Sequence, residues 1–243
     1  MRLQQYILNE GRSASISLDN AKEKLHKNCS DALKAWRKNG GYIYRGVRGM
    51  KNEYAYMDST KYDERASANT TNEYTVLINH ILDSWKQYPK RNVICITENV
   101  FASGHGATYH IFPYNGTKIG ICSGFDIWES FKSFEELIDL NDFIIDTYGN
   151  YSSVKELEKW LKETKIGDLD EQILDDSNYE GFLNYNFDMT LYDLFNKIIL
   201  NPVRNGFKLV KVGQNIPKDR EVWFDGKAVM VIYWPKDIIQ ELL

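Results

Sequence analysis

This sequence of 243 residues has little cysteine, little net charge and no long apolar run, and each shortage excludes a class of protein. The three cysteines, Cys29, Cys95 and Cys122, lie far apart without a C-x-x-C spacing, which argues against a disulfide framework and favours a reducing compartment. The longest apolar run, Ala228–Trp234, has the length of a strand, whereas a membrane span needs roughly 20 residues. Because no apolar secretory segment follows Met1 either, we expect neither export nor a membrane partner.

The 34 acidic and 30 basic residues leave a net charge of −4 with a pI of about 5.7, so the broad basic surface of a DNA-binding protein is not expected. What the chain does have is apolar and aromatic residues, 43% and 14% of the total, which supply enough surface for a packed core and exclude global disorder. The length predicts one large domain or at most two small ones.

Four segments carry apolar residues at every third or fourth position, which is typical of amphipathic helices. The first follows Ser17 as N-cap and ends at Gly40-Gly41. The third opens with the capping box Ser153–Glu156, and the second and fourth end before Pro89 and Pro202. The predicted helices cover residues 18–39, about 73–88, about 153–165 and about 190–201.

Short runs rich in β-branched and aromatic residues predict strands, and Asn115-Gly116 and Asp225-Gly226 are typical two-residue hairpin turns. The predicted strands cover residues 42–47, 93–97, 109–114, 118–122, 207–212, 221–224 and 228–233. Residues 49–72 are expected to form a loop, and the acidic, helical stretch 126–205 is expected to be an insert. This order of elements predicts an α+β fold with largely antiparallel sheets.

Three short segments carry residues suited to chemistry. In Tyr44–Gly46 an arginine lies inside an aromatic strand, and the following glycine lets another group approach the backbone. The planar fork of donors on Arg45 suits phosphate oxygens, although an edge-strand arginine that faces solvent is the alternative. The second segment is a hydrophobic strand that ends in the hydroxyl of Thr97, for which the alternative is a strand that ends at the surface.

The third segment, Asp219–Glu221, places two carboxylates at positions i and i+2 of a predicted strand, on one face. One carboxylate can hydrogen-bond a substrate and stabilise developing positive charge, while the other takes a proton from a nucleophile. The alternative is an ordinary strand that begins with charged residues at the surface.

In this order the three segments resemble the arginine–serine–glutamate class of ADP-ribosyltransferases. That family has an aromatic-Arg-Gly strand first, a hydrophobic strand ending in Ser-Thr-Ser second, and Glu-x-Glu before a hydrophobic strand third. Tyr44–Gly46 matches the first motif, Ile96–Glu98 the second imperfectly, and Asp219–Glu221 the third with one change. The resemblance covers roughly residues 22–233 and leaves the 126–205 insert unexplained. It implies split antiparallel sheets with flanking helices around an NAD-binding cleft.

The resemblance also implies that NAD is the substrate and that no metal is needed. It assigns a role to each residue expected to bind NAD. Arg45 and Gly46 would bind the pyrophosphate region of NAD. Thr97 would brace the catalytic strand pair and the nicotinamide ribose, and Phe101 would be a stacking surface for nicotinamide. Ile96 stands where the family has the first serine of its motif, which departs from the expected ribose contact.

The two carboxylates would carry the catalysis. Glu221 would hydrogen-bond the ribose 2′-hydroxyl and stabilise the oxocarbenium left when nicotinamide departs. Asp219 would orient or deprotonate the acceptor, which in the Glu-x-Glu subclass is commonly an arginine, although its side chain is one methylene shorter than the family's glutamate.

A second resemblance lies at the N-terminus. Residues 1–10 are similar to the capsid-targeting peptide of internal head proteins in T-even-like phages, and Leu8–Gly11 fits the site where the prohead protease cuts. The resemblance implies a propeptide over 1–10 and a single transferase-like domain over 11–243. The enzyme would be packaged in the virion head and delivered into the host cytoplasm, where the acidic charge suits a protein acceptor better than nucleic acid.

Other functions stay open at this point. They are a packaged internal head protein whose transferase-like fold has lost activity, an NAD glycohydrolase, and a transferase that modifies nucleic acid. A thiol hydrolase built from Cys95 or Cys122 with a histidine is disfavoured because no cysteine begins a recognisable helix. His105 and His110 lack further metal-ligand residues nearby. Target recognition is the expected role of the insert, and the oligomeric state is left open.

Overall fold

A computed structural model describes residues 13–39, 42–61, 73–131, 140–149, 151–169, 184–234, 238–239 and 242. The expected propeptide 1–10, its cleavage site Leu8–Gly11 and the helix stop at Gly40-Gly41 lie outside the described residues. The chain divides into two compact units. The first takes in Met1–Ala68, Tyr88–Asp126 and Lys208–Leu243, and the second takes in Asn69–Gln87 and Ile127–Phe207.

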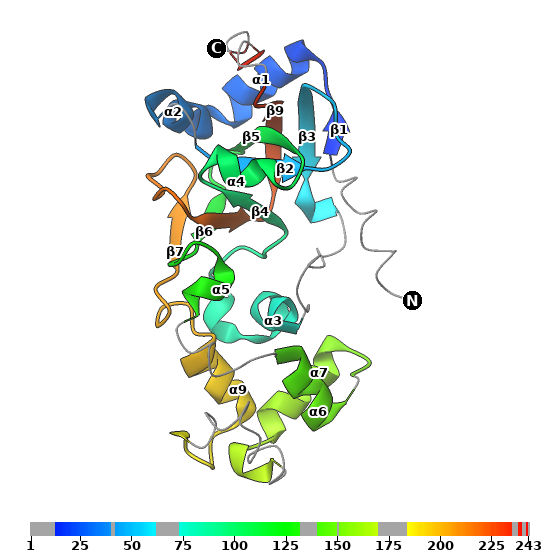
Figure 1. Ribbon diagram of the computed structural model, residues 1–243, viewed down its shortest axis with the longest axis vertical. Coiled ribbons are helices and arrows are strands. Elements are labelled where there is room, and N and C mark those ends of the chain that lie inside the picture. Colours follow the sequence, from blue (N-terminus) through cyan, green and yellow to red (C-terminus); the bar gives the residue numbers. More distant parts are fainter. Residues whose placement is uncertain are drawn as a thin grey trace. The chain divides into compact units, whose positions relative to one another are not determined.

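The first unit is built on a nine-stranded sheet whose described pairs are all antiparallel, in the order β1-β3-β9-β5-β2-β4-β8-β6-β7 (Figure 1). The strands are β1 (Ser13–Ser15), β2 (Tyr44–Val47), β3 (Tyr54–Asp58), β4 (Val93–Ile96), β5 (Ala107–Pro113), β6 (Lys118–Ile121), β7 (Lys208–Lys211), β8 (Glu221–Phe224) and β9 (Lys227–Ile232). The α+β fold with a largely antiparallel sheet is therefore confirmed. At its centre, β2 pairs with β4 only at Tyr44 and Ile96, so one residue pair joins the two halves of the sheet.

The loop predicted for residues 49–72 is wrong over Tyr54–Asp58, because these residues form β3 between β1 and β9. A half-buried strand reveals itself by alternating apolar and polar residues. Four of the five residues of β3 are buried, so that alternation is missing. The strand is defined by its two neighbours in the sheet rather than by its own pattern.

The helix predicted over 18–39 is in fact two helices, α1 (Leu18–Asn28) and α2 (Ser30–Asn39). The break comes at Cys29, where the side chain of Asn115 accepts a hydrogen bond from the backbone N–H of Asp31. The backbone N–H of Asn115 donates to the last carbonyl of α1, at Asn28. The turn at Asn115-Gly116 thus caps both helices at their junction, a contact that no local pattern reveals. The hairpins predicted there and at Asp225-Gly226 are wrong, because β5 does not pair with β6, nor β8 with β9.

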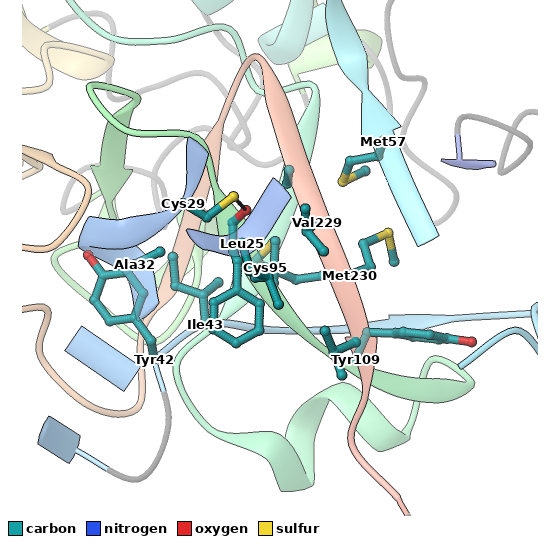
Figure 2. Close-up of a cluster of buried hydrophobic side chains, with 14 of the residues drawn as sticks. Leu25, Cys29, Ala32, Tyr42, Ile43, Met57, Cys95, Tyr109, Val229 and Met230 are labelled. Carbon is teal, nitrogen blue, oxygen red and sulfur yellow. Dashed lines mark hydrogen bonds between the residues drawn. The ribbon is translucent and has the colours of Figure 1, made fainter. Parts of the chain in front are cut away.

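Helix α1 packs against β3 and β9, and α2 against β5, and together they enclose the core of the first unit. Figure 2 shows Leu25 of α1, Cys29 between the helices and Ala32 of α2 in one cluster with Tyr42 and Ile43, which precede β2. Labelled side chains of β3, β4, β5 and β9 belong to the same cluster. The Cys29 thiol donates to the carbonyl of Phe112 at 3.2 Å. Burying a large aliphatic side chain such as that of Leu25 stabilises the fold by about 1.5–3 kcal/mol.

The second unit is helical in its described residues, as expected for 126–205, and it also takes in the 69–87 segment. Its elements are α3 (Glu73–Val76), the π-helical turn η3 (Leu77–Ile81), the 3-10 turn η4 (Asp83–Trp85), α5 (Ile127–Ser130), α6 (Leu140–Tyr148), α7 (Val154–Glu163), η6 (Ile166–Asp168), α9 (Leu191–Leu194) and η8 (Phe195–Ile199). The side chains of Ser153 and Thr190 cap α7 and α9 as predicted. Trp85 donates to the carbonyl of Leu200, which ties the two segments of this unit together.

Candidate active site

The three segments singled out in the sequence lie on adjacent strands of the first unit. Tyr44 of β2 is opposite Ile96 of β4, and Ile96 is in turn opposite Glu221 of β8. Neighbouring strands lie about 4.8 Å apart, so the strands of Arg45 and Glu221 are separated by about 10 Å. This spacing is within the length of one dinucleotide, which the NAD-binding hypothesis requires.

Arg45 lies inside the sheet, since β2 runs between β5 and β4, and the edge-strand alternative is therefore wrong. Its Nη1 donates to the carbonyl of Ile94 at 2.6 Å. The guanidinium thus adds a side-chain hydrogen bond between β2 and β4, whose backbones pair at only one pair of residues. Arginine has five N–H donors in a fixed fork, so this one bond leaves further donors for a phosphate. The pyrophosphate role stays a prediction.

Gly46 is explained by the packing of helix α4 (Asn99–Ser103) against β2. A Cβ at Gly46 would lie 2.0 Å from the carbonyl oxygen of Ala102 and 2.8 Å from the Cβ of His105. The group that approaches the glycine is thus the protein's own backbone. A backbone contact of Gly46 with NAD stays a prediction.

Thr97 joins β4 to the start of β8, and the strand brace expected of it is present. Its Oγ1 accepts from the backbone N–H of Arg220 at 3.0 Å, and its own N–H donates to the Arg220 carbonyl at 3.1 Å. Thr97 is buried, so the alternative of a strand that ends at the surface is wrong. These bonds hold the backbone just before Glu221; the contact of Thr97 with ribose stays a prediction.

Glu221 is held by a buried arginine that the sequence did not single out. Arg91 Nη2 lies 2.5 Å from Glu221 Oε1, and the side chains are 3% and 15% exposed. The Cys122 thiol lies 3.7 Å from the same oxygen. For Glu221, the alternative of a strand that begins with charged residues at the surface is therefore wrong. In the sequence, nothing distinguishes Arg91 from its neighbour Lys90 in the polar turn before β4.

Arg91 is itself positioned by Trp223, which shares a face of β8 with Glu221 because the two are at i and i+2. The guanidinium carbon lies 5.9 Å from the centre of the Trp223 ring. Trp223 Nε1 donates to the carbonyl of Pro89 at 2.9 Å, and the ring stacks on Tyr88. The segment that carries Arg91 is thus docked along the face of β8 that carries Glu221.

Asp219 does not share a strand face with Glu221, which corrects the expectation from the i, i+2 spacing. Strand β8 begins at Glu221, and Asp219 lies before it with a φ of +54°. Aspartate tolerates this left-handed conformation better than most residues. Asp219 is exposed, and its carbonyl accepts from the Arg220 guanidinium. Its role on the acceptor side stays a prediction.

Phe101 lies on α4 and is 43% exposed. Its ring makes an edge-to-face contact with Phe125 at 4.7 Å between centroids. The Phe125 carbonyl accepts from the Glu221 N–H at 2.7 Å, so the exposed Phe101 ring belongs to the surroundings of Glu221. The stacking of Phe101 on nicotinamide stays a prediction.

One of the two histidines considered as metal ligands, His110, is part of the core. His110 is buried, and its Nδ1 accepts from Trp36 Nε1 at 3.2 Å. Burial lowers the pKa of His110 from 6.5 to about 4, so the ring is neutral at pH 7. Within the described ranges, no three His, Cys, Asp or Glu side chains gather as a metal site.

No known protein family, curated protein or solved structure matches the chain. In the described part of the chain, no helix is long and apolar enough to cross a membrane. The features that bear on function are therefore the geometry around Glu221 and the resemblance of the three motifs.

Proposed function

We propose that this chain transfers ADP-ribose from NAD to a protein acceptor, an arginine side chain, with release of nicotinamide. The observation that carries the proposal is the strand order β2-β4-β8, which places the strands that carry the three motifs next to one another from distant parts of the sequence. The resemblance of the three motifs supports it independently, because the motifs belong to the sequence and do not depend on the strand order.

Side chains on and beside these three strands fit the parts of an NAD molecule. The Arg45 guanidinium offers donors to phosphate oxygens, and the exposed Phe101 ring offers a stacking surface. Glu221 would accept a hydrogen bond from the ribose 2′-hydroxyl and face the positive charge that develops as nicotinamide leaves with the glycosidic electron pair. A guanidinium nitrogen of the acceptor then bonds to C1′ and gives its proton to Asp219 or to water.

The second candidate is a chain with this sheet that does not cleave NAD. The Arg91–Glu221 ion pair favours it, because a buried arginine needs a carboxylate partner whether or not catalysis occurs. The presence of Glu221 alone therefore does not separate the two candidates. They differ in whether nicotinamide is released.

The test compares the wild-type chain with Glu221→Gln and Asp219→Asn, incubated with labelled NAD and a bacterial extract. Nicotinamide release and protein labelling are measured separately. Glu221→Gln should lower both by roughly 10²–10³ because it removes the charge opposite the transition state. Asp219→Asn should lower labelling while nicotinamide release continues, since a positioned base contributes roughly 10²–10⁴ to the acceptor step alone.

Glu23→Gln, an exposed change on α1, is the matched control and should alter neither activity. A wild-type chain that leaves NAD intact would favour the inactive candidate. Nicotinamide release without label on any macromolecule would indicate a glycohydrolase, and nuclease-sensitive label would indicate a nucleic-acid acceptor. Full nicotinamide release by Glu221→Gln would contradict the transferase proposal itself.

A further inference from the structure

We propose that Arg91 is a positioning residue that sets the Glu221 carboxylate for NAD cleavage. The inference rests on the proposed function and adds to it a residue that belongs to none of the three motifs. It stands on three contacts: the ion pair at 2.5 Å, the Trp223 ring beside the guanidinium, and the thiol of Cys122 against the same carboxylate oxygen.

Arg91 and Cys122 both contact the same carboxylate oxygen of Glu221, Oε1. The carboxylate is anchored to the protein through that oxygen, and a ribose hydroxyl would donate to the other, Oε2.

Glu221 is thereby held at both ends. Thr97 fixes the backbone of the preceding residue, Arg220, through three hydrogen bonds across the strands. Arg91 fixes the far end of the flexible side chain. A glutamate held only by its backbone samples several rotamers, and a catalytic group displaced by about 1 Å can lose about 10² in rate.

Arginine suits this position better than lysine. Its guanidinium keeps its charge when buried and presents planar donors that meet a carboxylate in a fixed direction. The flat group also lies beside the Trp223 ring, which a compact ammonium would fill less well. Lysine at position 91 would retain the charge but not the direction of the bond.

The experiment measures kcat and KM for nicotinamide release by the wild-type chain, Arg91→Gln and Arg91→Lys, each also in a Glu221→Gln background. Arg91→Gln should lower kcat by about 10² with KM for NAD unchanged, because positioning acts on the transition state rather than on binding. Arg91→Lys should recover part of the loss. In the Glu221→Gln background, Arg91→Gln should cause no further loss, since its effect passes through Glu221.

Arg204→Gln, an exposed arginine of the second unit, is the control for losing an arginine charge. An unchanged kcat in Arg91→Gln would overturn this inference but not the proposed function. A loss of equal size in the Glu221→Gln background would do the same, because that is the result expected if Arg91 only stabilises the fold. A rise in kcat would overturn it too, because Arg91 would then restrain Glu221. A wild-type chain that releases no nicotinamide would overturn the proposed function, and this inference with it, whatever the variants do.

Discussion

Arg91 and Glu221 depend on each other for stability as well as for geometry. Taking a guanidinium out of water is costly unless a carboxylate compensates it, and Arg91 is almost fully buried. Removing one partner leaves the other charge poorly solvated. A glutamate exposed at the start of a strand could be replaced with little change in stability, whereas Glu221, paired with Arg91, cannot.

We predict that Arg91→Gln lowers the free energy of unfolding by about 3 kcal/mol, the scale expected for breaking a buried ion pair. Lys218→Gln is the matched control, because Lys218 pairs with Glu98 at 3.9 Å on the surface. An exposed pair of this kind contributes less than about 1 kcal/mol. Urea unfolding of both variants at pH 7 and low salt measures the difference.

The double variant Arg91→Gln with Glu221→Gln gives the internal check. With both charges gone, a neutral amide faces a neutral amide, and the loss of stability should be smaller than the sum of the two single losses. Additive losses would show that the two residues act independently, against the contacts described above.

At the scale of helices and strands, local patterns predicted those elements whose signals are local. Ser17, Ser153 and Thr190 cap helices where the sequence placed them. The hairpins expected at Asn115-Gly116 and Asp225-Gly226 are wrong, because neither β5 and β6 nor β8 and β9 are neighbours in the sheet. Strand β3 and the break at Cys29 were missed, because one is defined by its sheet neighbours and the other by the distant Asn115.

The candidate site divides in the same way. Arg45, Thr97 and Glu221 stand out by residue type within short motifs, so the sequence could propose them together. Arg91 could not be proposed, because it meets Glu221 only after the fold brings together positions 130 residues apart. The orientation of Asp219 was also out of reach, since it depends on a backbone angle just before the strand.

Strand β6 contributes to the site through a glycine. A Cβ at Gly120 would lie 2.2 Å from the ring of Trp223, which crosses over it from β8. We predict that Gly120→Ala destabilises the chain by about 1–3 kcal/mol, as overpacking does. Nicotinamide release should fall as well, because a displaced Trp223 no longer supports Arg91.

Gly104→Ala is the control for this change. Gly104 has an ordinary helical φ and room for a Cβ, whose nearest neighbour would be 3.6 Å away. A compatible Gly→Ala change is expected to be neutral or to stabilise by about 0.4–1 kcal/mol. Thermal unfolding and nicotinamide release are measured on both; equal behaviour of the two variants would contradict the role given to Trp223.

At the scale of the whole molecule, every residue proposed for the site belongs to the first unit. Arg45, Thr97 and Glu221 come from its three separate chain segments, so the site exists only when the sheet is complete. Because the site is lost when the sheet unfolds, the stability of the sheet at low pH sets the lowest pH at which activity can be measured. A buried histidine on β5 affects that stability.

His110 on β5 packs among the rings of Trp36, Tyr44 and Tyr233, and burial lowers its pKa from 6.5 to about 4. Between these two values the unfolded chain binds a proton that the folded chain does not. The contribution of His110 to the free energy of unfolding is thus fully present above pH 6.5 and is lost as the pH falls toward 4, by about 3 kcal/mol in all.

We predict that His110→Gln, which keeps an acceptor for Trp36, is less stable than wild type at pH 7 but loses less stability between pH 6.5 and pH 4.5. Urea unfolding across that range measures the two slopes. Parallel slopes would show that the acid sensitivity of the molecule comes from its carboxylates and not from His110.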